Sequence, residues 1–260
     1  MKNIINTLSA IFNLGRAADP PWASANPCEG IERPATQQAT EPRFLTLEEL
    51  DALIANLPAS PFLEIDRVLF LTAALTGLRK GELVALRWQD VDWQAQRIRV
   101  RQNYTRGAFG TPKSRRSTRA VPMADEVAGA LDRLHQRSRW QADGDLVFAH
   151  PATGGGRAKS NISRRMAVAL KAAGLEEHRF HDLRHTFGTR AAGAGVPMRT
   201  LQEWMGHVDI QTTQIYADYA PGAHEAEMIG QAFARVDPSI TQPGAVQVQS
   251  GENLASPESA

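Results

Sequence analysis

Residues 178–219 read HRFHDLRHTFGTRAAGAGVPMRTLQEWMGHVDIQTTQIYADY, and this stretch contains four side chains suited to phosphate chemistry: His181, Arg184, His207 and Tyr216. His181 and Arg184 are three residues apart in a segment that the sequence predicts to be helical, so they project from one face. Gly206 is suited to a left-handed cap at the end of the next helix, which places His207 on the turn beyond it. Tyr216 follows nine residues later. Together they indicate a site that holds and cuts a phosphodiester.

Each of these residues, taken alone, has a plain structural interpretation. A single tyrosine on a helix is usually a half-buried packing residue whose hydroxyl finds some partner. His181 and His185 are spaced i, i+4, which can mark a zinc site. However, Asp182 stands where a zinc protease has glutamate, and no third ligand is evident, so we expect no metal. The spacing of the whole set favours function.

The motifs H-D-L-R-H-T, M-G-H and T-T-Q-I-Y resemble the C-terminal signature of the tyrosine recombinases of the phage-integrase type. That signature is H-x-x-R, a later L-G-H and a tyrosine nine residues on, and Met205 replaces the usual leucine. The resemblance implies that Tyr216 is the nucleophile, with Tyr219 as its nearby competitor. It also implies that Arg184 and His207 bind the phosphate, and that His181 helps to activate Tyr216.

An upstream arginine matches the same family. Arg79 lies in T-G-L-R-K-G-E, which fits the T-G-x-R-x-x-E context of the family's first catalytic arginine. Glu82 is three residues further on. Its side chain either orients the Arg79 guanidinium or forms an ordinary surface pair, and the sequence does not decide between these.

The segment from residue 97 to residue 123 predicts a basic β-hairpin. Residues 97–101 alternate arginine with Ile98 and Val100, which indicates a half-buried strand, and STRAVPM returns as its partner. The turn between them contains TPKSRR, and its Lys113 is either simply solvated or a catalytic group at the scissile phosphate. The family pattern T-x-K-x-x-x-S-x-R-x-V-P is met here, so the resemblance implies that Lys113 protonates the leaving oxygen. The expected DNA contacts are Arg99, Arg101, Arg115, Arg116, Arg119 and Lys159.

These patterns predict an α+β fold that is mainly α-helical, like a tyrosine-recombinase catalytic domain with a small antiparallel sheet on one edge. Thr46 and Glu49 form a capping-box pattern that opens the first helix of this domain. We expect residues 1–42 to be the last helix of an N-terminal DNA-gripping domain, most of it missing, plus a linker. Residues 43–236 would form the catalytic domain, and residues 237–260 a disordered tail. The stretch GGGRAKS fails the P-loop pattern and is predicted to be a loop.

The net charge of +1 does not by itself indicate a nucleic-acid partner, but its distribution does. Between Arg79 and Arg119 there are eleven Lys and Arg against three acidic residues, whereas residues 237–260 contain no Lys or Arg. A basic region of this kind is where a polyanion would bind. The single cysteine, Cys28, excludes an intrachain disulfide and fits a reducing compartment, and no apolar run is long enough for a membrane span. We therefore expect a cytoplasmic protein without a membrane partner.

The resemblance implies a site-specific recombinase that cleaves and rejoins double-stranded DNA through a 3′-phosphotyrosyl bond, without metal, ATP or another cofactor. It further implies a monomer that assembles into a homotetramer on DNA. Two alternatives remain at this point. One is a type IB topoisomerase, which uses a similar set of residues. The other is a truncated or decayed integrase that binds DNA without completing strand exchange.

Overall fold

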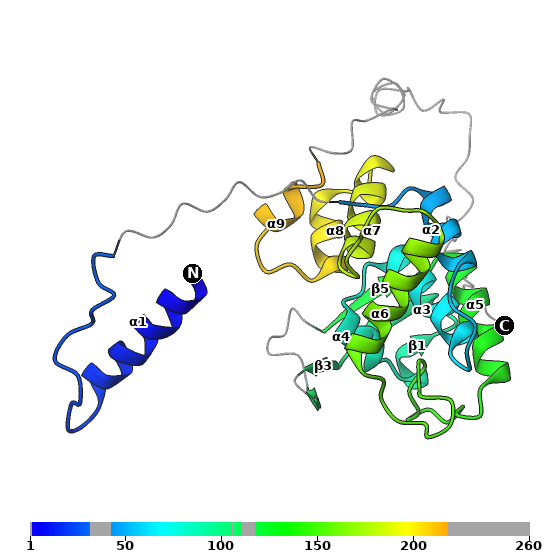
Figure 1. The fold of residues 1–260 in the computed structure, drawn as a ribbon. Helices are drawn as coiled ribbons and strands as arrows, with labels where there is room; N and C mark the ends of the chain where they lie inside the picture. The colour runs from blue at the N-terminus through cyan, green and yellow to red at the C-terminus, as the bar shows by residue number, and fades with distance from the viewer. Residues whose placement is uncertain (1, 32–42, 106, 111–117, 218–260) are drawn as a thin grey trace, which may run out of the picture. The chain divides into compact units, whose positions relative to one another are not determined.

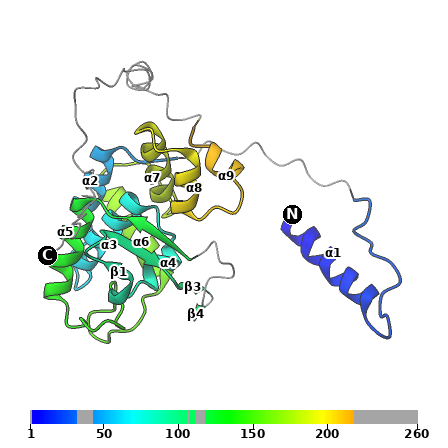
Figure 2. The same ribbon diagram turned by 180° about the vertical axis from the view of Figure 1, so that it is seen from behind.

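The computed structural model describes residues 2–31, 43–105, 107–110 and 118–217. As expected, most of the regular structure is helical, with small antiparallel sheets (Figures 1 and 2). Several predicted features lie outside the described residues: the tip of the hairpin with Lys113, Arg115 and Arg116, the residues from 218 on with Tyr219, and the tail. None of the described helices combines the length and apolar character that a membrane span requires.

Helix α3 (Leu63–Thr76) is the centre of the core. Leu69, Phe70 and Ala73 are fully buried, because α2 (Leu47–Ala55), α5 (Asp125–Arg137) and α7 (Asp182–Gly193) pack around it. The helix ends at Gly77, whose φ of 64° is the left-handed conformation that glycine adopts most easily. The chain then turns into the short helix α4 (Lys80–Val84), with Arg79 as its N-cap. The end of the core helix thus fixes the position of Arg79.

A three-stranded antiparallel sheet lies beside these helices, with strand order β1 (Val91–Asp92), β2 (Arg97–Val100) and β5 (Arg119–Pro122). The predicted alternation in β2 is confirmed, since Ile98 and Val100 are buried while the arginines between them are exposed. Val100 pairs with Arg119, so the register brings the first residue of β5 to the end of β2. A short 3₁₀ helix (Trp88–Asp90) precedes the sheet.

The turn expected after β2 contains a second small sheet. β3 (Asn103–Thr105) pairs with β4 (Ala108–Gly110), and the rings of Tyr104 and Phe109 contact each other in a tilted arrangement, with centroids 4.8 Å apart. Three further helices complete this part of the chain: α6 (Lys159–Ala172), α8 (Met198–Met205) and α9 (Gln211–Gln214). In both ribbon views α7, α8 and α9 lie together, and Figure 2 shows the β3–β4 hairpin most clearly.

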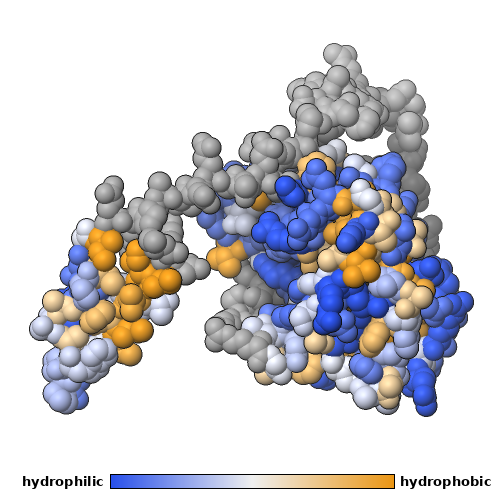
Figure 3. Space-filling view, viewed as in Figure 1, coloured by the Kyte–Doolittle hydropathy of each residue, from blue (hydrophilic) through white to orange (hydrophobic). Residues whose placement is uncertain are grey.

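The N-terminal segment is a helix followed by a stretch that folds back onto it. In α1 (Lys2–Ala17) the apolar side chains of Ile4, Leu8 and Ile11 are exposed, and Figure 3 shows apolar atoms on the surface of this helix. Asn26 holds this stretch on the helix, because its side-chain amide donates to the Ser9 carbonyl oxygen and hydroxyl and to the side chain of Asn13. The assignment of this segment to a second domain remains a prediction.

A buried ion cluster ties α3 to the loop before α6. Asp66 on α3 is fully buried and pairs with Arg157 at 2.7 Å and with Arg165 on α6. The Arg157 guanidinium also lies 4.5 Å from the ring centroid of Phe62. The first five residues of GGGRAKS form a loop, as predicted, whereas Lys159 and Ser160 already belong to α6, and Arg157 anchors the loop to the core.

Removing the anion of this cluster should destabilise the fold strongly. Asp66→Asn would leave two arginines near a neutral group, one of them buried, and breaking a buried pair typically costs about 3–5 kcal/mol. We expect that loss in urea unfolding at pH 7. Glu64→Gln, which breaks the exposed pair between Glu64 and Arg137, should change the same free energy by less than about 1 kcal/mol. Equal effects of the two substitutions would contradict this interpretation.

Candidate active site

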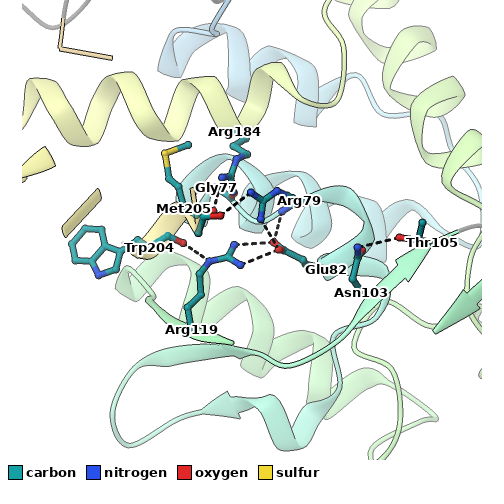
Figure 4. Close-up of polar contacts among 10 residues, drawn as sticks. Gly77, Arg79, Glu82, Asn103, Thr105, Arg119, Arg184, Trp204 and Met205 are labelled. Atoms are coloured by element: carbon teal, nitrogen blue, oxygen red, sulfur yellow. Dashed lines mark hydrogen bonds and ion pairs between the residues drawn. The ribbon is translucent and has the colours of Figure 1, made fainter. Parts of the chain in front are cut away.

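Three arginines from distant parts of the chain converge at the C-terminal end of α8. Arg79 comes from the turn after α3, Arg119 from the start of β5 and Arg184 from the first turn of α7 (Figure 4). Each donates to one of three consecutive carbonyl oxygens at that helix end. The pairs are Arg119 Nε with Trp204 O at 2.6 Å, Arg184 Nη2 with Met205 O at 2.5 Å, and Arg79 Nη2 with Gly206 O at 3.0 Å.

This arrangement follows from the ending of α8. The last carbonyls of a helix have no partner within the helix and carry the negative end of its dipole, so they attract cations. Gly206, with φ of 64°, ends α8 and turns the chain away. Arg184 completes its contacts by donating through Nη1 to the Gly77 carbonyl at 2.5 Å. Arg184 thus joins the glycine that ends α3 to the last residue of α8.

Glu82 neutralises part of this positive charge. Its carboxylate accepts two hydrogen bonds from Arg119, at 2.9 and 2.8 Å, and one from Arg79 Nη1 at 3.0 Å. Its second oxygen also accepts from the Arg79 backbone N–H at 2.8 Å, and its side chain is only 7% exposed. Burial alone would raise the pKa of Glu82, but the hydrogen bonds and charge of Arg119 and the charge of Arg79 lower it to about 2. Glu82 therefore orients the arginines, and its contact with Arg79 is not an ordinary surface ion pair.

Arg119 has a different place from the one expected. Its side chain is 6% exposed, and all three of its guanidinium nitrogens are engaged by Glu82 and by the Trp204 carbonyl. These contacts position Glu82 and the end of α8, and the predicted contact of Arg119 with DNA remains a prediction. Arg79, by contrast, is 39% exposed and open to a ligand.

Two histidines lie beside the arginines as neutral groups. Burial, His185 and Arg184 lower the pKa of His181 to about 4. Burial, Arg184 and Arg79 lower the pKa of His207 to about 3. His207 Nδ1 lies 2.9 Å from the hydroxyl of the fully buried Thr213 on α9, which leaves Nε2 for another partner. At neutral pH both imidazoles can exchange hydrogen bonds without adding charge.

Tyr216 reaches the same region from the turn after α9. The residue is 1% exposed, and its ring is stacked with that of His207 at 6.4 Å between centroids. Its hydroxyl lies 3.0 Å from His185 Nδ1, whereas we expected His181 to assist it. Burial raises the pKa of Tyr216, while the charges of Arg184 and Arg79 lower it. One chain therefore supplies both the arginines and the tyrosine.

The remaining predicted residues lie further out. Arg99 pairs with Asp92 at 2.5 Å and Arg101 lies 3.6 Å from Asp90, so part of the charge on the sheet is already compensated. Lys159 begins α6, with its ammonium 5.8 Å from the ring centroid of Tyr104. Within the described parts of the chain, no three His, Cys, Asp or Glu side chains gather in a way that could hold a metal ion.

Two clefts flank the arginine cluster and include basic residues that the sequence analysis did not single out. One is lined by Lys80, Arg179 and His181, and the other by Arg97, Arg199 and His207. Lys80 donates to the Ser163 hydroxyl at 2.7 Å, and burial together with nearby Lys159 lowers its pKa. Lys80 directly follows Arg79 in the sequence, but only the fold shows that it faces α6.

The sequence model of the phage integrase family matches residues 43–222. Among curated relatives, a tyrosine recombinase XerC-like protein of Caldanaerobacter subterraneus subsp. tengcongensis is 28% identical over 85% of this chain. The integrase of Mycobacterium phage L5 is 30% identical over 90% of it. The chain spans 62% of the length of each of these two relatives.

Solved structures show the same fold. The crystal structure of XerA recombinase is similar with a TM-score of 0.55 and 28% identity, covering 78% of this chain and 68% of the other. The Tn1549 transposon integrase in complex with a circular intermediate DNA has a TM-score of 0.66 and 24% identity, covering 89% and 78%. These likenesses support the α+β architecture described above.

The charge arrangement around Glu82 makes the stability of the domain pH dependent. The folded pKa is about 2, below the ordinary 4.5, so the stabilisation is fully present above pH 4.5 and is lost as pH falls towards 2. A shift of this size corresponds to roughly 3 kcal/mol. We expect Glu82→Gln to lower the free energy of unfolding by about that amount at pH 7, with the difference shrinking below pH 4.5. Glu203→Gln, at an exposed pair, should show no such trend.

Proposed function

This chain belongs to the phage integrase family, and from that premise we propose that it cleaves and rejoins double-stranded DNA through a covalent 3′-phosphotyrosyl intermediate. The observation that carries the proposal is the meeting of Arg79, Arg184, His207 and Tyr216 at the end of α8 within one chain. The full-length relatives are named integrases and recombinases, and this chain spans only part of them.

The arginines supply the electrostatic part of the reaction. Hydrolysis of a phosphodiester is extremely slow, and catalysis has to lower its barrier by on the order of 20 kcal/mol. Guanidinium groups present planar pairs of donors to non-bridging oxygens and stabilise charge as the phosphorane forms. Arg79 is exposed enough to bind the phosphate, and the buried Arg184 adds its field from behind. His207, neutral and held by Thr213 through Nδ1, donates a further hydrogen bond through Nε2.

The reaction is a transesterification. The Tyr216 oxygen bonds to phosphorus as the bond to the 5′ oxygen breaks, the phenolic proton leaves to a base, and the departing oxygen takes a proton from Lys113. The phosphodiester energy is kept in the phosphotyrosyl bond, so rejoining is the reverse step and needs no nucleotide or metal ion. Lys113 lies outside the described residues, and its role is part of this proposal.

The partner that we propose is duplex DNA, bound along the two clefts beside the arginine cluster. Lys80, which lines one cleft, and the nearby Lys159 would contact backbone phosphates on one side, and Arg97 and Arg199, which line the other cleft, would do so on the other side. Related proteins have been solved on DNA, including XerH on a difH substrate and a lambda integrase dimer on a core site. We propose that this chain likewise assembles on DNA, as a tetramer during recombination, and acts in the cytoplasm.

The nucleophile can be tested directly. Tyr216→Phe should leave folding and DNA binding near normal and abolish covalent attachment to a nicked suicide duplex, measured as a shifted band on a denaturing gel. Tyr219→Phe is the matched control and should attach normally. If Tyr219→Phe is the inactive variant, the nucleophile is assigned wrongly. A protein that only binds DNA would give no covalent band even as wild type.

Lys113 can be tested through its leaving group. Lys113→Ala should be defective on ordinary DNA, and a substrate with sulfur at the 5′ bridging position should restore its cleavage rate to within about tenfold of wild type. A thiolate leaves without protonation, so a general acid becomes unnecessary on that substrate. Equal defects on oxygen and sulfur substrates would show that Lys113 only binds the DNA backbone.

A further inference from the structure

His185 is a chemically capable side chain in this site to which the function proposed above assigns no role. It lies on α7, one residue after Arg184, and its Nδ1 is 3.0 Å from the Tyr216 hydroxyl. Among the residues that the structure describes, His185 is the hydrogen-bond partner of the Tyr216 hydroxyl. His181 lies behind it, with its ring centroid 4.9 Å from that of His185 in an edge-on arrangement.

The contact is held by the packing around Tyr216. The ring lies in a pocket formed with Leu201 and Met205 of α8. On the α7 side, a Cβ atom added to Gly188 would lie 2.6–2.7 Å from three ring carbons, so the ring occupies space that only a glycine leaves open. Gly188 and His185 are three residues apart on α7 and therefore share a face. The same face thus accommodates the ring and contacts its hydroxyl.

We propose that His185 is the proton acceptor for Tyr216 during strand cleavage. This role rests on the proposed function, because it concerns the deprotonation of the nucleophile. The Tyr216 hydroxyl donates to Nδ1 of a neutral His185 whose own proton is on Nε2. As the tyrosine oxygen bonds to phosphorus, its proton moves to Nδ1 and leaves an imidazolium. In the reverse step the imidazolium returns the proton to the leaving tyrosine.

The charges around His185 suit an acceptor. Burial lowers its pKa, so the ring is neutral at pH 7 and free to take a proton. Asp182, on the same helix, raises the pKa and would stabilise the imidazolium, whereas Arg184 and Arg179 oppose it. Tyr216 faces it from the turn after α9, and the charges of Arg184 and Arg79 favour the phenolate. The tyrosine and the base are thus in contact, and a carboxylate three residues before His185 on the same helix favours its charged form.

His181 is less suited to this step. Its pKa is lowered to about 4, by burial first, and both Arg184 and Arg79 oppose a positive charge on it. Asp182 raises the pKa of both histidines, but Arg79 opposes a positive charge on His181 in addition to Arg184. We therefore divide the roles: His185 takes the tyrosine proton and His181 binds the phosphate.

The first test concerns the protein without DNA. In protein with ¹⁵N-labelled histidine, the imidazole nitrogen shifts of His185 should report a neutral ring with its proton on Nε2 at pH 7. Tyr216→Phe should change the Nδ1 shift because the hydrogen bond is lost. A proton on Nδ1, or no response to Tyr216→Phe, would overturn the proposal, independently of any activity on DNA.

The second test measures covalent attachment to a suicide duplex against pH. His185→Asn keeps an oxygen near the position of Nδ1 and can accept the hydrogen bond, but it cannot take the proton. General base catalysis typically contributes about 10²–10⁴-fold, so we expect a loss in that range at pH 7. The residual rate should rise about tenfold per pH unit, because free phenol ionises only near pH 10. The wild-type rate should be level above pH 7.

Matched variants distinguish a wrong role for His185 from a wrong function for the whole protein. His181→Asn should slow cleavage without adding this pH dependence, and thermal unfolding of each variant checks that it folds. A His185→Asn variant with wild-type rate and pH profile would overturn the role of His185 alone. The steep pH profile appearing in His181→Asn instead would transfer the role to His181. A wild-type protein that forms no covalent complex would overturn the proposed function, and with it this step.

Discussion

The structure depends on holding three guanidinium groups close together in a largely buried place. Like charges at short range repel, and each charge loses solvation on burial. Arg184 shows the cost, since burial together with Arg79 and Arg119 lowers its pKa to about 9. The opposing contributions are the Glu82 carboxylate and the successive carbonyls at the end of α8. Without both contributions, repulsion and lost solvation would favour separation of the three arginines.

This constraint couples the catalytic geometry to the architecture of the whole domain. Arg79 follows the core helix α3, Arg119 starts the strand that pairs with β2, and α8 supplies the oxygens. Because the same hydrogen bonds join these elements and place the donors, the site is complete only when they are all packed. A bound phosphodiester would add negative charge where the positive charge is in excess, so substrate binding would relieve part of the repulsion.

The tyrosine that we propose as the nucleophile is placed by a different kind of force. Tyr216 is positioned mainly by apolar packing against α7 and α8, with a glycine leaving room for its ring. Its burial raises the pKa of the phenol, which keeps the group protonated, while the arginine field acts in the opposite direction. Because the phenol is protonated in this environment, its reaction as a nucleophile requires a neighbouring base that accepts the proton. The arginine cluster is therefore held by polar contacts, and Tyr216 mainly by packing.

The sequence by itself determined the local features and the family of the chain. The capping box of Thr46 and Glu49, the helix end at Gly206 and the alternation in β2 are all found as expected, because each depends on neighbours within a few residues. The tertiary structure decided the long-range pairs: Glu82 with Arg119, and His185 with Tyr216. His181 and His185 are four residues apart and lie on one face, so the sequence does not decide which of them meets the tyrosine. That choice depends on how α9 packs on the other helices. Periodicity encodes the faces of helices and strands, whereas the matching of those faces depends on how distant segments fill the core.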